Sequence, residues 1–272
     1  MIAHHPKNGT TLILVDIQND FHPGGSLAIP TANMDAKRIA DLIRRGSSNV
    51  DSQNKIDRII ATMDSHHKLH IAHPGFWVSG DDESKTPQPF TIITSADVKS
   101  GIWTPRKNLK LPADVFDGNS DFCDEDGNID LLHYCVEYTK KLEDKGRFKL
   151  CIWPEHCIIG SKGHCVVEDV HKAMEEWSSI TGGSIEWVMK GQHLLTEMYS
   201  AFAAEVPISQ ETSFNMNLLN GILRSERVLI AGQASSHCVN YTTRDIMRVT
   251  PKNESNKFII LRGTFLSSYH HI

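Results

Sequence analysis

The chain has 272 residues, which is enough to bury a substantial core, and we expect one domain over residues 1–272 with an insertion inside it. Its 28 basic and 33 acidic residues give a formal net charge of −5 without any long basic run, so the composition indicates neither nucleic acid nor a membrane surface as a partner. There is no apolar run long enough to span a bilayer and no apolar core of a signal peptide near the N-terminus. We therefore expect a cytoplasmic protein whose six cysteines are reduced thiols.

Strand and helix patterns alternate along most of the chain. The pattern predicts strands, rich in Val and Ile, over residues 11–15, 57–63, 185–189, 227–231 and 258–262, with a further ordered run at 148–154. It predicts helices over residues 32–45, 168–178, 213–224 and 240–247. This alternation is typical of an α/β protein with a doubly wound, mostly parallel sheet.

The alternation is interrupted between residues 74 and 149. This segment is rich in Gly, Asp, Ser and Pro, and one helix is predicted in it, over residues 129–142. Because an unbroken loop of that length is unusual in a compact domain, we interpret 74–149 as an insertion with some structure of its own.

Four of the apolar runs lead into residues with useful chemistry, namely Asp16, Asp64, Lys190 and Cys238. In open α/β sheets the reactive groups gather beyond the carboxyl ends of the strands, so a carboxylate, an ammonium and a thiol are expected to meet there. Cys238 follows a turn of small residues and begins a helix, whose dipole would lower the pKa of the thiol. The hypothesis is nucleophilic catalysis by cysteine. The alternative is a small buried cysteine, a turn carboxylate and a surface lysine with no common function.

Histidines cluster around the end of the second strand. Asp64 and His66 are two residues apart in extended chain, so their side chains leave on the same side, and His70, His73 and His156 follow. Oxygen and nitrogen donors of this kind suit zinc, or iron or manganese, with positions left open for water or substrate. The alternative is that these imidazoles are simply solvated, and His73 receives no role in either interpretation.

Five segments, in this order, resemble the isochorismatase-like cysteine hydrolases and among them the nicotinamidases. They are residues 16–27, 64–70, 153–157, 190–202 and 232–239. The resemblance implies a six-stranded parallel sheet with helices on both faces and a catalytic triad of Asp16, Lys190 and Cys238. It implies metal ligands and an oxyanion hole as well: Asp64, His66 and His156 for the metal with His70 beside them, and the N–H groups of Ala234 and Cys238 after a cis peptide bond for the oxyanion.

By similarity, the function would be the hydrolysis of nicotinamide to nicotinate and ammonia through a cysteine thioester, as part of NAD salvage. The implied cofactor is a divalent metal, with zinc first and iron or manganese as alternatives. Phe21 and Trp77 are candidates for the wall of the substrate pocket, with a place in the core as the alternative. The expected partner is a small-molecule amide, and we expect a homo-oligomer in which the insertion is a lid or a subunit contact.

The sequence departs from the family in three places. The insertion has no counterpart in compact members, the nucleophile turn reads Ser235-Ser236-His237, and the closing helix of many members is missing or replaced after the last strand. The altered turn leaves two other functions open. One is hydrolysis of another small amide, of the carbamoyl or ureido type, and the other is a binding or scaffold role without turnover.

Overall fold

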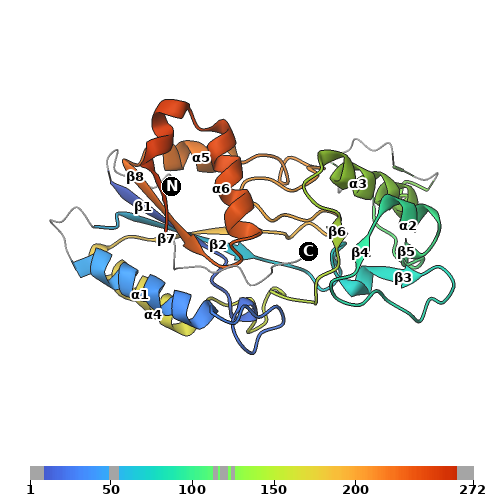
Figure 1. Cartoon of the computed structure of the whole chain (residues 1–272), viewed down its shortest axis with the longest axis horizontal. Helices are drawn as coiled ribbons and strands as arrows, with labels where there is room; N and C mark the ends of the chain where they lie inside the picture. The colour runs from blue at the N-terminus through green and yellow to red at the C-terminus, as the bar shows by residue number, and fades with distance from the viewer. Residues whose placement is uncertain (1–8, 49–54, 113–115, 117–121, 124–125, 262–272) are drawn as a thin grey trace.

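The computed structural model describes residues 9–48, 55–112, 116, 122–123 and 126–261 (Figure 1). At its centre is a five-stranded sheet in the order β7-β2-β1-β8-β9, and every neighbouring pair is parallel. The strands are β1 (Thr10–Val15), β2 (Arg58–Asp64), β7 (Ile185–Lys190), β8 (Arg227–Gly232) and β9 (Phe258–Ile260). The predicted fold class, an α/β protein with a doubly wound parallel sheet, is confirmed.

Helices cover both faces of this sheet, which explains why β1 and β2 read as continuous apolar runs. On one face α1 (Ala32–Ser48) and α4 (Glu168–Thr181) pack against Leu12 and Leu14 of β1. On the other face α5 (Met216–Leu223) and α6 (Cys238–Val249) share a core with Ile13 and Val15. The four helices predicted outside the segment 74–149 are therefore present. No helix in the described residues is long and apolar enough to cross a membrane.

The described residues of the segment 74–149 lie beyond the end of the sheet toward which β2 points (Figure 1). Its elements, with β6 just after it, are β3 (Trp77–Ser79), β4 (Ile92–Ile93), α2 (Ser95–Lys99), β5 (Trp103–Pro105), α3 (Leu131–Lys145) and β6 (Leu150–Cys151). Strands β3 and β5 pair antiparallel, as do β4 and β6, and α3 packs against α2. Asp130 caps the start of α3 and Gly146, at a φ of 63°, ends it.

Three short 3₁₀ helices, at Asn19–Phe21, Pro74–Phe76 and Lys252–Lys257, complete the described elements. The six-stranded sheet implied by the resemblance is not found in the described part of the chain. The run at 148–154 contributes only β6, which pairs with β4 instead of joining the central sheet. The prediction of a missing closing helix concerns residues after Leu261, which lie outside the described residues.

Candidate active site

The register of the sheet brings the chemical groups to one edge. Asp64 is paired directly with Lys190 across β2 and β7, and Val15, which precedes Asp16, is paired with Gly232 of β8. Because these four strands are adjacent and parallel, their carboxyl ends lie side by side. Cys238 joins them as the first residue of α6, which follows β8 after a short turn.

The ammonium group of Lys190 is the centre of the site. Its Nζ lies 3.0 Å from Asp16 Oδ2, 2.9 Å from Asp64 Oδ1 and 3.6 Å from Cys238 Sγ. It also donates to the main-chain oxygen of Met198 at 3.2 Å. Lys190 is 1% exposed and Asp16 is 0% exposed, so this contact takes place away from water. The carboxylate, ammonium and thiol are therefore close enough to exchange a proton.

The electrostatics of the site fix the resting charges. Burial opposes the charge on Lys190, but the carboxylates of Asp16 and Asp64 outweigh it and raise the lysine pKa well above its usual range. Burial also raises the pKa of the Cys238 thiol, and the nearby ammonium reverses that only in part. The sequence argument from the helix dipole expected the opposite direction for Cys238. The thiol therefore rests protonated and needs a base to become a nucleophile.

Asp16 is held in place by a residue that sequence reasoning missed. Thr62 Oγ1 donates to Asp16 Oδ1 at 2.6 Å, and the Asp16 N–H points back at the main-chain oxygen of Thr62 at 3.3 Å. Asp16 has a φ of 51°, in the left-handed region that costs a non-glycine residue about 1–2 kcal/mol. The only signal in the sequence is a lone hydroxyl residue inside the apolar run of β2.

The nucleophile turn is tight and strained. Ala234 has a φ of 55°, and its carbonyl accepts from the N–H groups of His237 and Val239 at 2.9 and 3.4 Å. The cis peptide bond expected before Ala234 is not found, since no peptide bond is cis among the described residues. The turn instead reverses direction through the left-handed conformation of Ala234, which brings Cys238 to the start of α6.

Asp64 also belongs to a buried cluster of metal-type donors. His66 Nε2 lies 3.2 Å from Asp64 Oδ1, and His156 Nε2 lies 3.2 Å from Asp64 Oδ2. The donor atoms of these three residues all lie within 4.8 Å of one another. Burial opposes the charge on Asp64, but His66 and Lys190 hold the pKa of its carboxyl well below the usual range. A carboxylate with two imidazoles fits a divalent ion that keeps positions open.

The imidazoles of His66 and His156 are each oriented by a main-chain oxygen that lies near Nδ1, on the side of the ring away from Asp64. His66 Nδ1 lies 3.0 Å from the main-chain oxygen of Gly191, and His156 Nδ1 lies 2.8 Å from that of Pro154. Because a carbonyl oxygen only accepts, the neutral form of each ring carries its hydrogen on Nδ1, which leaves the Nε2 lone pair for a metal ion.

Two more histidines from the same loop reach this cluster. The donor atoms of His66, His70 and His73 also lie within 4.8 Å of one another, and all three side chains are buried. The Nε2 atoms of His70 and His73 have no hydrogen-bond partner in the described structure, which is unusual for buried polar atoms and fits a site made for an additional group. Sequence reasoning placed His70 here and missed His73, although their spacing on one loop was the available signal.

The opening motif after β1 positions the metal-type donors. Gln18 Oε1 accepts from the Asp64 N–H at 2.7 Å, while its Nε2 donates to the Asp64 carbonyl at 2.7 Å, so one amide clamps both main-chain groups of Asp64. Asp20 Oδ2 accepts from the N–H of Cys157 at 2.6 Å and so holds the chain just beyond His156. Neither role was predicted from the sequence.

Aromatic residues surround the site. Phe21 lies edge-on to the His156 ring at 5.7 Å, next to the donor cluster. Trp77 is 0% exposed and therefore lies in the core. Its Nε1 donates to the Ile71 carbonyl at 2.7 Å, in the loop that carries His70 and His73.

On the nucleophile side, Trp153 and Tyr199 each pack edge-on against His237, at 5.3 and 5.2 Å, directly before Cys238. Trp153 Nε1 also donates to the Tyr199 hydroxyl at 3.0 Å. This aromatic wall beside the thiol was not anticipated from the sequence.

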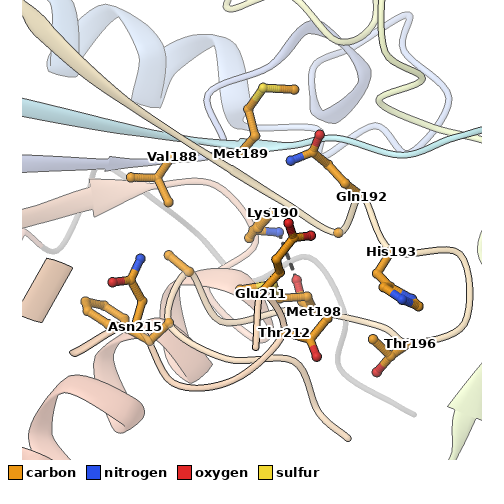
Figure 2. Close-up of a pocket in the computed structure, with 13 residues that line it drawn as sticks. Val188, Met189, Lys190, Gln192, His193, Thr196, Met198, Glu211, Thr212 and Asn215 are labelled. Carbon is orange, nitrogen blue, oxygen red and sulfur yellow. Dashed lines mark hydrogen bonds between the residues drawn. The ribbon is translucent and has the colours of Figure 1, made fainter. Parts of the chain in front are cut away.

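A small cavity lies beside Lys190 and is lined by the end of β7 and by the loop that follows it. Figure 2 shows the lysine pointing toward the Met198 carbonyl within it. Its volume is about 110 Å³, and Lys190 is the only triad residue in its wall. Pockets for drug-sized ligands are usually about 300–1,000 Å³, so this space is smaller than those.

Neither a protein-family model nor the sequence of a curated protein matches this chain. Solved structures do match it. The yeast nicotinamidase bound to the inhibitor nicotinaldehyde is 21% identical, with a TM-score of 0.52 over 88% of this chain and 82% of that chain. A second structure of the yeast nicotinamidase gives a TM-score of 0.51 at the same identity and coverage. The chain has the fold of these nicotinamidases, which is the fold that the sequence resemblance implied.

Proposed function

We propose that the protein is a metal-dependent amidohydrolase that cleaves nicotinamide to nicotinate and ammonia through a thioester on Cys238. The observation that carries this proposal is the position of Lys190. Its ammonium contacts Asp16, Asp64 and Cys238 at once, so it joins a nucleophile and base to a cluster of metal-type donors. The fold shared with the yeast nicotinamidase supports the same reaction class.

In this mechanism Asp16 takes the proton from Cys238 as the sulfur attacks the amide carbon. Because burial raises the pKa of the thiol, the proton stays on sulfur until the base removes it at the moment of attack. The ammonium of Lys190 stabilises the negative charge that develops. Main-chain N–H groups at Ala234 and Cys238 would hold the oxyanion, each contributing about 3–4 kcal/mol in comparable sites.

The intermediate then collapses and the carbon–nitrogen bond breaks. Asp16 returns its proton to the leaving nitrogen, ammonia departs, and the acyl group remains on Cys238 as a thioester. Asp16 next removes a proton from a water molecule, which attacks the thioester carbon and releases nicotinate and the free thiol. Asp64, His66 and His156 would hold the divalent ion, zinc first, with iron or manganese as alternatives, and that ion would supply a ligand position for the pyridine nitrogen.

The donor cluster is what favours a pyridine carboxamide over other small amides. A carbamoyl or ureido substrate has no ring nitrogen. A metal ion held by the buried carboxylate and imidazoles would therefore have no such atom to bind and orient. Cleavage of nicotinamide would place the protein in NAD salvage, since its product is nicotinate.

The test is ammonia release from metal-replete protein with nicotinamide, benzamide and a panel of carbamoyl and ureido compounds. Benzamide is the matched control because it has the same shape and the same amide but lacks the ring nitrogen. We expect nicotinamide to be cleaved with the highest kcat/KM. Faster release from a ureido compound would contradict the substrate, and no release from any amide would favour a scaffold without turnover.

A further inference from the structure

The insertion brings an aromatic side chain to the aromatic wall beside the proposed nucleophile. Strands β4 and β6 pair antiparallel, on the side of the insertion nearer the central sheet (Figure 1). The pairing extends by two hydrogen bonds, from the Ile152 N–H to the Thr91 carbonyl at 2.9 Å and from the Phe90 N–H to the Ile152 carbonyl at 2.5 Å. This antiparallel register places Phe90 opposite Trp153, which belongs to the wall.

Trp153 links Phe90 to the nucleophile turn. The Phe90 ring lies edge-on to Trp153, with centroids 5.9 Å apart and ring planes at 88°. Trp153 in turn lies edge-on to His237 at 5.3 Å, and His237 directly precedes Cys238. Trp153 also comes shortly before His156 in the chain. Phe90 is therefore joined through one ring to the segments that carry the thiol and a metal-type donor.

The backbone of Phe90 is strained although the residue is partly exposed. Its φ is 70°, in the left-handed region, where a bulky residue is a genuine outlier. Glycine would adopt this conformation without strain. Phe90 is 42% exposed, so packing in the core does not explain why a large ring stands there. A strained aromatic residue that borders a candidate site points to contact with a ligand.

We infer that Phe90 is a specificity-determining residue of the proposed amidase. Its ring closes the outer end of the aromatic wall beside Cys238 and contacts the aromatic ring of the bound substrate. The inference rests on the proposed function and deepens it, because it gives the insertion a part in choosing aromatic amides over aliphatic ones. None of the five segments that carry the sequence resemblance contains Phe90.

A contact of this kind acts on binding and not on the chemical step. The edge-on packing of two rings favours a substrate that has a ring and gives nothing to an aliphatic amide. The contact is made away from the scissile bond, so it is the same in the ground state and in the transition state. Its loss should therefore raise KM and change kcat little.

Three substitutions separate the ring of Phe90 from its backbone. Phe90→Tyr keeps a ring, Phe90→Ala removes the ring but keeps the strained φ, and Phe90→Gly removes both the ring and the strain. The matched control is Leu132→Ala, at a 48% exposed apolar residue of α3 in the same insertion. The full-length, metal-replete proteins are compared in ammonia release from nicotinamide, in inhibition of that reaction by acetamide, and in thermal melting.

We expect the KM for nicotinamide to rise about three- to tenfold in both Phe90→Ala and Phe90→Gly, as the loss of an aromatic contact predicts. Phe90→Tyr and Leu132→Ala should keep the wild-type KM. The inhibition constant of acetamide, which has no ring to meet Phe90, should not rise with that KM. Phe90→Gly should melt at a higher temperature than Phe90→Ala because only the glycine relieves the backbone.

A wild-type KM in both Phe90→Ala and Phe90→Gly would overturn the inference. A wild-type KM in Phe90→Gly alone would also overturn it, because the effect would then come from the backbone. A fall in kcat without a rise in KM, or an equal rise in the acetamide constant, would do the same by assigning Phe90 to support of the site as a whole.

Failure of the proposed function has a different signature. If wild type releases no ammonia from nicotinamide or benzamide, the proposed reaction is wrong, and calorimetric binding of benzamide then tests Phe90 without turnover. Weaker binding to Phe90→Ala and Phe90→Gly than to wild type would support the aromatic contact. Equal binding to all three proteins, or no binding to wild type, would overturn it.

Discussion

Lys190 Nζ lies 2.9 Å from Asp64 Oδ1, in an ion pair between two residues that face each other at the ends of β7 and β2. The same nitrogen lies 3.0 Å from Asp16, so one buried cation compensates two buried carboxylates. Lys190 therefore couples Asp16 and Cys238 electrostatically to Asp64 and the other metal-type donors. A change of charge on one side of Lys190 should alter the electrostatics of the other side.

Replacing Lys190 should destabilise the fold as well as stop the reaction. Lys190→Met leaves the carboxylates of Asp16 and Asp64 buried without a cation, and breaking a buried pair in this way typically costs about 3–5 kcal/mol. The free energy of unfolding in urea measures this loss. Lys172→Met, which removes an exposed lysine with 59% of its side chain accessible, should change it little. Equal midpoints for the two variants would contradict the compensation.

Removing the thiol should abolish ammonia release and leave the fold intact. Cys238→Ala deletes the atom that forms the thioester, and we expect the rate of ammonia release to fall by about 10⁴-fold or more. Circular dichroism and thermal melting check the fold, and Cys165→Ala, at an exposed cysteine, is the matched control. Full activity in Cys238→Ala would rule out this residue as the nucleophile.

Thr62 should act by positioning the base. Thr62→Val keeps the shape of the side chain but removes its 2.6 Å hydrogen bond to Asp16 Oδ1. Hydrogen bonds to charged groups contribute about 1.5–3 kcal/mol, so we expect kcat to fall about tenfold or more while KM changes little. Steady-state kinetics measure both constants. The same substitution at Thr11, which bonds Ser225 at the opposite end of β1, should leave kcat unchanged. A rise in KM alone would instead assign Thr62 to substrate binding.

Gly191 should be intolerant of any side chain. It has a φ of +75°, and a Cβ there would lie 2.8 Å from His66 Cε1 and 3.1 Å from Asp64 Oδ1. Gly191→Ala should lower both stability and metal content, because the added methyl group displaces two metal-type donors. Gly182→Ala is the control, since Gly182 has a φ of +71° with nothing within 4 Å of its Cβ position. It should lose stability but keep its metal by elemental analysis. Equal metal content in the two variants would contradict the prediction.

Glu205 should make stability depend on pH. It is 4% exposed, and burial raises the pKa of its carboxyl from 4.5 to about 7, although Arg147 opposes the shift. Its contribution to stability is therefore fully present below pH 4.5 and is lost as the pH rises through 7. Glu205→Gln removes this loss, so the variant should gain about 2 kcal/mol relative to wild type between pH 5 and pH 8. Urea unfolding at both values measures the gain, and Glu226→Gln, at an exposed position, should show none.

Those parts of the fold that depend on local pattern could be predicted from the sequence. The apolar runs located all five strands of the central sheet, and the residues after them, Asp16, Lys190 and Cys238, meet because parallel strands end at one edge. The run at 148–154 was ambiguous for a related reason. A short apolar run gives no information about its partner, and β6 pairs with β4 at the periphery.

What could not be predicted depends on contacts between distant segments. Thr62 matters because register places it beside Asp16, and Gln18 because it reaches across to Asp64. The pKa of Cys238 went the opposite way because burial, together with the carboxylates of Asp16 and Asp64, raises it more than Lys190 lowers it, and burial is a property of the finished fold.

The central place of β1 has a consequence for synthesis of the protein. Its neighbour β8 begins at Arg227, so the first strand to leave the ribosome waits for nearly the whole chain before both of its edges are covered. Pairing over such a separation makes folding slow and leaves an apolar edge open to other chains meanwhile. Translation must pass residue 238 before the proposed nucleophile exists, so a truncated product would carry the aggregation hazard of this fold without the proposed activity.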